Sequence, residues 1–393
     1  MLETLLRFSL TQRIFIAVVA VVLAILGGGA WKSIPIDAFP EISPTQVKLI
    51  LKAPGMTAEE IERRVTVPIE TELLGIPRQE MLRSMTKYAI TDITLDFKEG
   101  TDLYWARQQV AERLATVREQ LPATVSGGLA PMSTPLSEMY MFTLENPNLS
   151  LLEKRDILDW EIRPLLRTVP GVADVNVLGG EARSYIIRPD FALMAELEVS
   201  LDDIRNAVSD TLQPVGAGRI NQGSDVLTVR AETSMVKGAD LESVVVARSP
   251  DKVYRLGDVA MISVGHLARY GAVTRDGVEA AQALVIALRG SNTGEVAAGV
   301  SAKLEEITPS LPKGSEINVF YDRSRLIDTA VGTLSTALVQ SVVLVIALLA
   351  LFLGNLRAAF IVSLSLPLAA LMTFLFMSLS GVTANLMSLG GLV

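Results

Sequence analysis

Residues 329–356 read TAVGTLSTALVQSVVLVIALLALFLGNL and contain no charged side chain. After Arg357, residues 358–393 are again uncharged. A helix needs about 20 apolar residues to cross the hydrocarbon core of a bilayer, so the two runs hold two full crossings and the start of a third. Gly354 and Asn355 are typical of a turn and favour a hairpin between antiparallel membrane helices. The sequence therefore predicts an integral membrane protein.

A further uncharged run, Ile14–Trp31, lies near the N-terminus, behind Arg7 and Arg13. Positive charge before a membrane helix keeps that end in the cytoplasm. The small residues Gly27–Ala30 leave a cleaved signal peptide as an alternative, but the run is longer than a signal core and later spans follow. We therefore expect a retained anchor.

The segment between the membrane runs, residues 32–328, is predicted to be a water-exposed ectodomain. Its composition is globular, and this orientation places it outside while Arg357 returns to the cytoplasmic side. The chain has a net charge of −8, which argues against nucleic acid as a partner. It has no cysteine and one histidine, His266, so disulfides, thiolate metal sites and Ser-His-Asp catalysis have no basis. We expect no enzyme activity.

The ectodomain begins with a strand–helix–strand–strand–helix pattern. Thr45–Lys52 alternates like a strand, and Thr57 with Glu60 forms a capping box that opens a helix running to about Leu74. Residues 81–88 and 90–97 are predicted as strands, and residues 103–120 as a second helix that ends before Pro122. This order is typical of a ferredoxin-like, split βαβ unit.

The pattern recurs downstream, so the ectodomain contains an internal repeat. The second copy uses residues 138–144, a helix opened by Ser150 and Glu153, residues 173–178, and then residues 281–321. An insertion of about residues 180–271 interrupts it, and glycines punctuate a predicted hairpin or loop there. We expect an α+β membrane protein with these divisions: 1–31, N-terminus and first transmembrane helix; 32–134, first ferredoxin-like subdomain; 135–179 with 272–328, second ferredoxin-like subdomain; 180–271, insertion; 329–393, later transmembrane helices up to the start of the fourth.

This organisation resembles the resistance-nodulation-division (RND) exporters along the whole chain. The matching motifs are PIDAFP (35–40), APG (53–55), ERRVTVPIE (62–70), KEGTD (98–102), YWARQ (104–108), YDRS (321–324), GNLR (354–357) and NLMSLGG (385–391). Pro68–Glu70 and Gly100–Asp102 make the chain most similar to the heavy-metal efflux branch.

The resemblance implies a multi-pass protein of the bacterial inner membrane with a periplasmic ectodomain. It implies that residues 32–134 are a first porter subdomain, that residues 135–179 with 272–328 are a second porter subdomain, and that residues 180–271 are a docking insertion. It also implies a homotrimer that works with a periplasmic adaptor protein and an outer-membrane channel. Leu103, Ala106, Arg107 and Val110 would belong to the helix that lines the central pore of the trimer. The segment 214–225, with Pro214, Val215 and Ile220, would be the arm that clasps a neighbouring protomer.

Four residues are candidates for a substrate cleft. Met139 and Met141 lie two apart on a predicted strand and so share one face, and thioethers suit Cu(I) and Ag(I). The alternative is that they fill the core, as methionine often does. Glu138 and Asp174 could bind a harder cation such as Zn²⁺ or Co²⁺, or they could be ordinary solvated carboxylates at strand ends. The metal ligands thus stay open.

No cofactor is expected, because Gly216 and Gly218 lack the strand-to-helix setting of a nucleotide-binding loop. The spans carry no ionisable side chain, whereas proton pathways need them. The resemblance places those acids in the fourth span, which begins just before Val393. We therefore expect the N-terminal part of a proton-driven exporter of heavy-metal cations, inactive alone. The alternatives are an exporter of organic compounds and a membrane-anchored periplasmic binding or scaffold protein.

Overall fold

The computed structural model describes residues 11–34, 36–38, 40, 43–134, 136–212, 216–222, 225–230, 241–248 and 252–391. The chain divides into two compact units. The first comprises residues 1–145, 159–177 and 282–393, and the second comprises residues 146–158 and 178–281. The first unit carries the apolar helices, and the second carries most of the predicted insertion.

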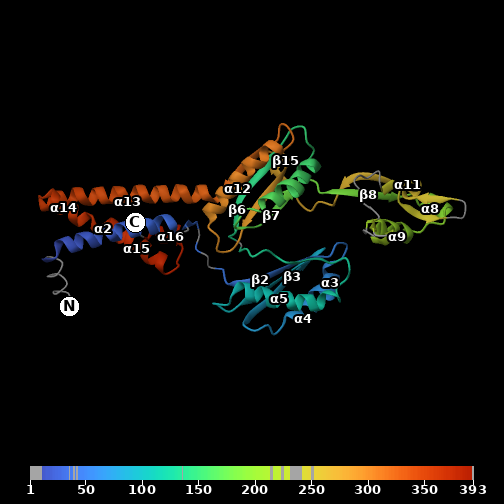
Figure 1. Ribbon diagram of the computed structural model, residues 1–393, viewed down its shortest axis with the longest axis horizontal. Helices are drawn as coiled ribbons and strands as arrows, with labels where there is room; N and C mark the ends of the chain where they lie inside the picture. Colours follow the sequence, from blue (N-terminus) through green and yellow to red (C-terminus); the bar gives the residue numbers. More distant parts are fainter. Residues whose placement is uncertain are drawn as a thin grey trace. The chain divides into compact units, whose positions relative to one another are not determined.

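Within the described residues, three helical segments are long and apolar enough to cross a membrane: Arg13–Trp31, Arg323–Phe352 and Leu356–Leu379. They correspond to helices α2 (Arg13–Ser33), α13 (Arg323–Leu353), and the consecutive α14 (Leu356–Ser363) and α15 (Ser365–Leu379) (Figure 1). Gly354 ends α13 in the left-handed region with φ 60°, and the side chain of Asn355 caps α14. The predicted hairpin turn at these two residues is confirmed.

Helices α2 and α15 pack closely. The rings of Trp31 and Phe374 meet edge to face, with centroids 4.4 Å apart. Gly27 explains the close approach, because a Cβ there would come within 2.5 Å of the Leu371 carbonyl oxygen. Small residues at helix interfaces in membranes allow this contact.

The first porter region forms a four-stranded antiparallel sheet in the order β3-β4-β2-β5. Its helices cover one face of the sheet, and a single buried cluster that includes Leu49, Ile93 and Val110 fills the space between (Figure 1). The elements are β2 (Thr45–Lys52), α3 (Ala58–Ile61), η1 (Glu62–Thr66), α4 (Val67–Leu73), β3 (Gln79–Lys87), β4 (Ile90–Phe97), α5 (Leu103–Arg118) and β5 (Ser126–Leu129).

The second porter region repeats this plan. The sheet has five strands: β15 pairs with β6, β7 and β14 (Val273–Arg275), and β16 pairs with the other edge of β6. Without β14, the order β7-β15-β6-β16 matches that of the first region. The elements are β6 (Glu138–Glu145), α6 (Leu151–Asp156), η2 (Ile157–Ile162), α7 (Arg163–Leu166), β7 (Val172–Gly179), β15 (Val278–Ala287), α12 (Thr293–Ile307), η3 (Thr308–Ser310) and β16 (Glu316–Asp322).

The first helix of both copies has the same irregularity. A π-helical turn, η1 or η2, precedes a short α-helix with proline at its start, Pro68 in α4 and Pro164 in α7. The helix therefore changes its hydrogen-bonding pattern just where proline removes a donor. The shared irregularity supports the internal repeat.

The insertion has a core of its own, which includes Met194, Ile204, Leu241 and Leu256. Strands β8 and β13 pair along their full length, and β9 with β10 forms a hairpin. The elements are β8 (Arg183–Pro189), α8 (Phe191–Glu196), α9 (Leu201–Leu212), β9 (Gly216–Gln222), β10 (Asp225–Arg230), β11 (Val245–Arg248), β12 (Val253–Arg255), α11 (Leu256–Val259) and β13 (Ala260–His266).

Candidate functional site

The methionines on β6 are placed in the interior of the fold. Met139 is fully buried, and Met141 is half-buried. The intervening Tyr140 points to the other face, where its hydroxyl bonds Ser301 of α12, and burial raises its pKa. Glu138 is exposed at the start of the strand. Burial of Met139 favours the core-filling role for this methionine.

Asp174, on β7, is held by arginines. Arg163 Nη2 lies 3.1 and 3.2 Å from its two carboxylate oxygens, and Arg167 Nε lies 3.5 Å from Oδ1. The backbone N–H of Val175 also donates to Oδ1. The carboxylate charge is thus balanced within the protein, and strand β7 pairs with β15 rather than with the methionine strand.

Neither carboxylate of this set, Glu138 or Asp174, belongs to a cluster of metal-ligating side chains in the part of the chain that the structure describes. Among the residues that the structure describes, no group of three or more histidine, cysteine, aspartate or glutamate side chains could hold a metal ion. Asp174 lies in an ion-pair network, Met139 lies in the core, and only Glu138 is open to solvent.

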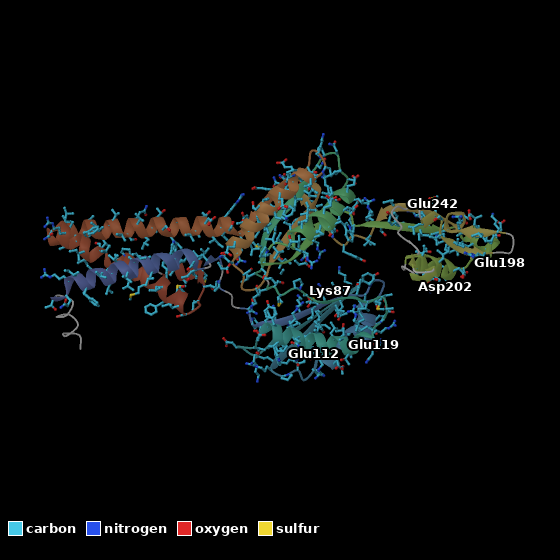
Figure 2. All side chains as sticks on the ribbon, viewed as in Figure 1. Lys87, Glu112, Glu119, Glu198, Asp202 and Glu242 are labelled. Carbon is cyan, nitrogen blue, oxygen red and sulfur yellow. The ribbon has the colours of Figure 1, made fainter. Side chains whose placement is uncertain are left out.

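Helix α5 carries the residues assigned to the predicted pore helix. Ala106 and Val110 are fully buried in the core of their own subdomain, and Leu103 packs against that core. Arg107 is half-buried, where burial lowers its pKa, and it donates to the carbonyl of Ala130 at 2.5 Å. The spacing of Ala106 and Val110 places them on the face of α5 toward the sheet, and the role of the helix in a pore stays a prediction. The exposed face carries Tyr104, Gln108, Glu112 and Glu119; Figure 2 labels the last two.

The predicted arm lies only partly within the described residues. Pro214 and Val215 lie outside them, and of Ile220 the structure describes the backbone alone. Ile220 belongs to β9, where it pairs with Leu227 of β10. Gly216 and Gly218 also lie in this strand, so this segment is a paired hairpin.

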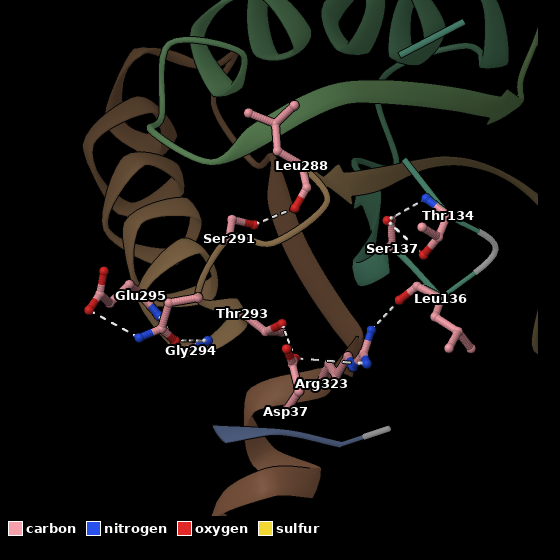
Figure 3. Close-up of polar contacts among 11 residues, drawn as sticks. Asp37, Thr134, Leu136, Ser137, Leu288, Ser291, Thr293, Gly294, Glu295 and Arg323 are labelled. Carbon is pink, nitrogen blue, oxygen red and sulfur yellow. Dashed lines mark hydrogen bonds and ion pairs between the residues drawn. The ribbon is translucent and has the colours of Figure 1, made fainter. Parts of the chain in front are cut away.

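A polar junction that the sequence did not reveal lies where the membrane helices meet the second porter region (Figure 3). Thr293, the first residue of α12, donates its hydroxyl to Asp37 Oδ1 at 2.5 Å. Arg323, the first residue of α13, places Nη2 3.9 Å from the same oxygen. Arg323 also donates to the carbonyl of Leu136, just before β6. Asp37 thus joins two helices that start more than 250 positions further along the chain.

The backbone around Asp37 makes a second connection. Strand β1 (Ile36–Asp37) pairs in parallel with β17 (Ala384–Asn385), with Asp37 opposite Asn385. The Asn385 side chain accepts from the N–H of Ser388 and so caps α16 (Leu386–Gly390). The start of α16 is therefore tied to the same acidic residue.

The loop before α12 completes this region. Arg289 donates to the carbonyls of Ser43 and Pro44 at 2.5 and 3.0 Å. A polar cavity of about 40 Å³ is lined by Asp37, Thr134, Ser137, Ser291, Thr293 and Arg323, among others. Two motifs from opposite ends of the ectodomain, PIDAFP and YDRS, supply Asp37 and Arg323. Both motifs were visible in the sequence, but nothing in it indicated that they meet.

Comparison with known proteins gives a consistent result along the whole chain. The model of the AcrB/AcrD/AcrF family matches residues 5–393. Protein HelA of Legionella pneumophila is 38% identical, and the cobalt-zinc-cadmium resistance protein CzcA of Cupriavidus metallidurans is 36% identical. The cation efflux system protein CusA of Escherichia coli K12 is 34% identical. Each alignment covers 100% of this chain and 38% of the relative.

Solved structures agree with these relatives. The crystal structure of a heavy metal efflux pump superimposes on 98% of the chain with a TM-score of 0.88 and 31% sequence identity. The chain covers 39% of that pump. It therefore spans less than half the length of the curated relatives and of the solved structure that it matches.

Proposed function

Because the chain belongs to the AcrB/AcrD/AcrF family of RND permeases, we propose that it is the N-terminal part of an exporter of heavy-metal cations. The observation that carries this proposal is similarity over the full chain to proteins described as cation efflux or cobalt-zinc-cadmium resistance proteins. The metal is the substrate of such a protein and not a resident cofactor.

The membrane arrangement follows from charge. Arg7 precedes α2, Arg13 is the first residue of α2, and Arg357 is the second residue of α14, just after the turn that follows α13. If these arginines stay in the cytoplasm, α2 and α13 cross in opposite directions, and residues 32–328 lie in the periplasm of a bacterial inner membrane. This arrangement puts the porter regions on the side of the membrane toward which an exporter moves its cation.

We infer that the two porter regions are ferredoxin-like subdomains and that residues 180–271 are a docking insertion. Both sheets share one strand order, and the insertion has a separate core, which supports these assignments. In the proposed assembly three copies form a homotrimer, and the periplasmic part contacts an adaptor protein and an outer-membrane channel. In that trimer, the exposed face of α5 with Tyr104 and Gln108 would line the central pore.

Proton drive is also proposed. A proton pathway across a membrane needs ionisable side chains within it. The sequence of α14 and α15 offers only Arg357, at the turn, and α13 has no ionisable residue after Asp328. We propose that the proton relay lies in a part of the exporter outside this chain, so that residues 1–393 alone do not transport.

Growth under metal stress tests the proposal. The full-length exporter, expressed in a host without its own metal exporters, should raise the tolerated concentration of at least one of Zn²⁺, Co²⁺, Cd²⁺, Cu⁺ and Ag⁺ several-fold. Residues 1–393 expressed alone form the matched control and should give no protection. Resistance to organic dyes or detergents without resistance to any metal would replace the proposal with an exporter of organic compounds.

A further inference from the structure

Asp37 is contacted by chain segments that belong to different parts of the protein. Its side chain accepts from Thr293 at the start of α12 and lies 3.9 Å from Arg323 at the start of α13. Its backbone pairs with Asn385 at the start of α16. These three segments and β1, which carries Asp37, lie in one compact unit. Figure 3 shows the side chains of Asp37, Thr293 and Arg323 converging.

The side chains that meet at this junction are largely shielded from water. Thr293 is 5% exposed, and the side chains of Arg323 and Asp37 are 7% and 28% exposed. A charge pair and a charge-assisted hydrogen bond are stronger at partly buried positions than on an open surface, because water screens them less. Movement of any one partner would therefore be resisted by the others.

Helix α13 connects the membrane-embedded segment directly to this junction. It runs without a break over 31 residues, which is about 46 Å at 1.5 Å per residue. A bilayer core is about 30 Å thick, so roughly ten residues of α13 extend beyond it. Arg323 sits at the first position of this helix. Displacement of the membrane-embedded part of α13 is thus carried to Asp37 by a continuous helix.

Helix α12 is the periplasmic element at the junction. It packs on β6 and, through Ser301, bonds the hydroxyl of Tyr140 on that strand. A shift at Thr293 therefore reaches the sheet that carries Glu138 and the two methionines.

We propose that Asp37 is a positioning residue that couples the membrane helix α13 and the short helix α16 to the periplasmic helix α12. The inference rests on the proposed function, because coupling matters only if the membrane part drives the porter part. Asp37 touches neither metal nor proton in this account. Asp37 transmits a displacement of α13 to α12. A variant without the Asp37 contacts should therefore still bind metal but fail to transport it.

The test compares variants of the full-length exporter. Thr293→Val keeps the shape of the side chain but removes its donor to Asp37, and Asp37→Asn removes the charge that faces Arg323. Thr308→Val is the matched control, since the Thr308 hydroxyl bonds Leu304 within the far end of α12. Ile36→Cys with Ala384→Cys places a disulfide across the β1–β17 pair, in a chain that has no cysteine of its own over residues 1–393.

The first readout needs no transport. Hydrogen exchange of the α16 amides should become at least fivefold faster in Thr293→Val, although Thr293 does not touch α16, and should stay unchanged in Thr308→Val. The second readout is Zn²⁺-stimulated proton flux in proteoliposomes. Thr293→Val and Asp37→Asn should lose at least tenfold in flux with the Zn²⁺ Kd within twofold of wild type, while the oxidised double-cysteine variant keeps its flux.

Unchanged exchange at α16 in Thr293→Val, or flux within twofold of wild type, overturns the coupling role. If Asp37→Asn does not fold, hydrogen exchange and proton flux of Thr293→Val alone decide whether Asp37 has the coupling role. If the wild-type exporter shows no metal-stimulated proton flux, the proposed function fails, and hydrogen exchange at α16 still decides whether Asp37 links the segments.

Discussion

Arg163 holds Asp174 in a two-pronged ion pair, with its Nη2 3.1 and 3.2 Å from the two carboxylate oxygens. Arg167 adds a third contact to the same carboxylate. A carboxylate that balances two guanidinium groups is a poor ligand for a passing cation, because binding the metal would leave both arginines without their partner. Asp174 therefore acts as a structural residue of β7.

Asp174→Asn should lower the stability of the protein without changing metal selectivity. The amide keeps the size of the side chain but loses the charge, which should cost about 1 to 2 kcal/mol for a pair that is only partly exposed. Thermal unfolding in detergent measures the loss, with Glu138→Gln as the control at an exposed position. A metal-resistance profile that changes with Asp174→Asn at normal protein levels would contradict the structural role.

The periplasmic position of the ectodomain can be tested by labelling. Ser126→Cys lies on exposed β5, and Arg357→Cys lies at the exposed start of α14, just after the turn that follows α13. In intact spheroplasts an impermeant thiol reagent should modify the cysteine at 126 and not the one at 357. After lysis both should react. The reverse pattern would mean that the arginines lie outside and that the topology is inverted.

Two capping boxes should make the porter helices sensitive to acid. The pKa of Glu60 is lowered from its usual 4.5, first by the backbone N–H of Thr57 and then by its hydroxyl, and Ser150 lowers the pKa of Glu153 in the same way. A lowered folded pKa means that the ionised form stabilises the fold above pH 4.5 and that this contribution is lost as the pH falls through the folded value.

Protection of the Thr57 and Glu60 amides against exchange should therefore fall below pH 4.5, when each rate is compared with the intrinsic exchange rate at the same pH. Glu60→Gln is the control, because it cannot titrate and should remove the extra pH dependence. An identical pH profile in wild type and Glu60→Gln would show that the carboxylate does not hold the start of α3.

The hairpin of the insertion should contribute to self-association. Deleting residues 215–223 removes β9 and leaves the core around Met194 and Leu256 in place. We expect the full-length protomer to fold and its trimer to weaken, which cross-linking and sizing in detergent would measure. A trimer of unchanged stability after the deletion would identify the hairpin as an ordinary surface feature.

Local sequence patterns predicted much of this fold. Charge-free runs located the membrane helices, because no soluble environment favours helices that are apolar on every face. Capping boxes at Thr57 and Ser150 located helix starts, and both are present in the structure. Strand ends were less accurate: β15 begins at Val278 rather than at residue 281. A strand end depends on its partner strand, which sequence alone does not place.

The candidate site was less predictable. Ala106 and Val110 lie on the core-facing stripe of α5 in the structure. The resemblance to a pore helix said nothing about which face of that helix meets the pore. The junction at Asp37 could not be found, because Thr293 lies 256 positions away and the contact exists only once two helices start at the same point. Charged residues in the PIDAFP and YDRS motifs were the one available signal.

The chain alone should not move metal. Its membrane helices offer no proton pathway of their own, so residues 1–393 reconstituted in liposomes should show Zn²⁺-dependent proton flux no greater than empty liposomes. Empty liposomes and the full-length exporter are the two references. Substrate-dependent flux from the 393-residue chain would mean that the driving residues lie within it.

Transport in everted membrane vesicles tests the proposed export of metal most directly. Vesicles that contain the full-length exporter should accumulate at least one of Zn²⁺, Co²⁺, Cd²⁺, Cu⁺ and Ag⁺ when their interior is acidic. A protonophore should abolish the accumulation, and vesicles with residues 1–393 alone should show none. Failure to accumulate any of these cations under an imposed proton gradient, or accumulation that a protonophore leaves unchanged, would contradict proton-driven metal export.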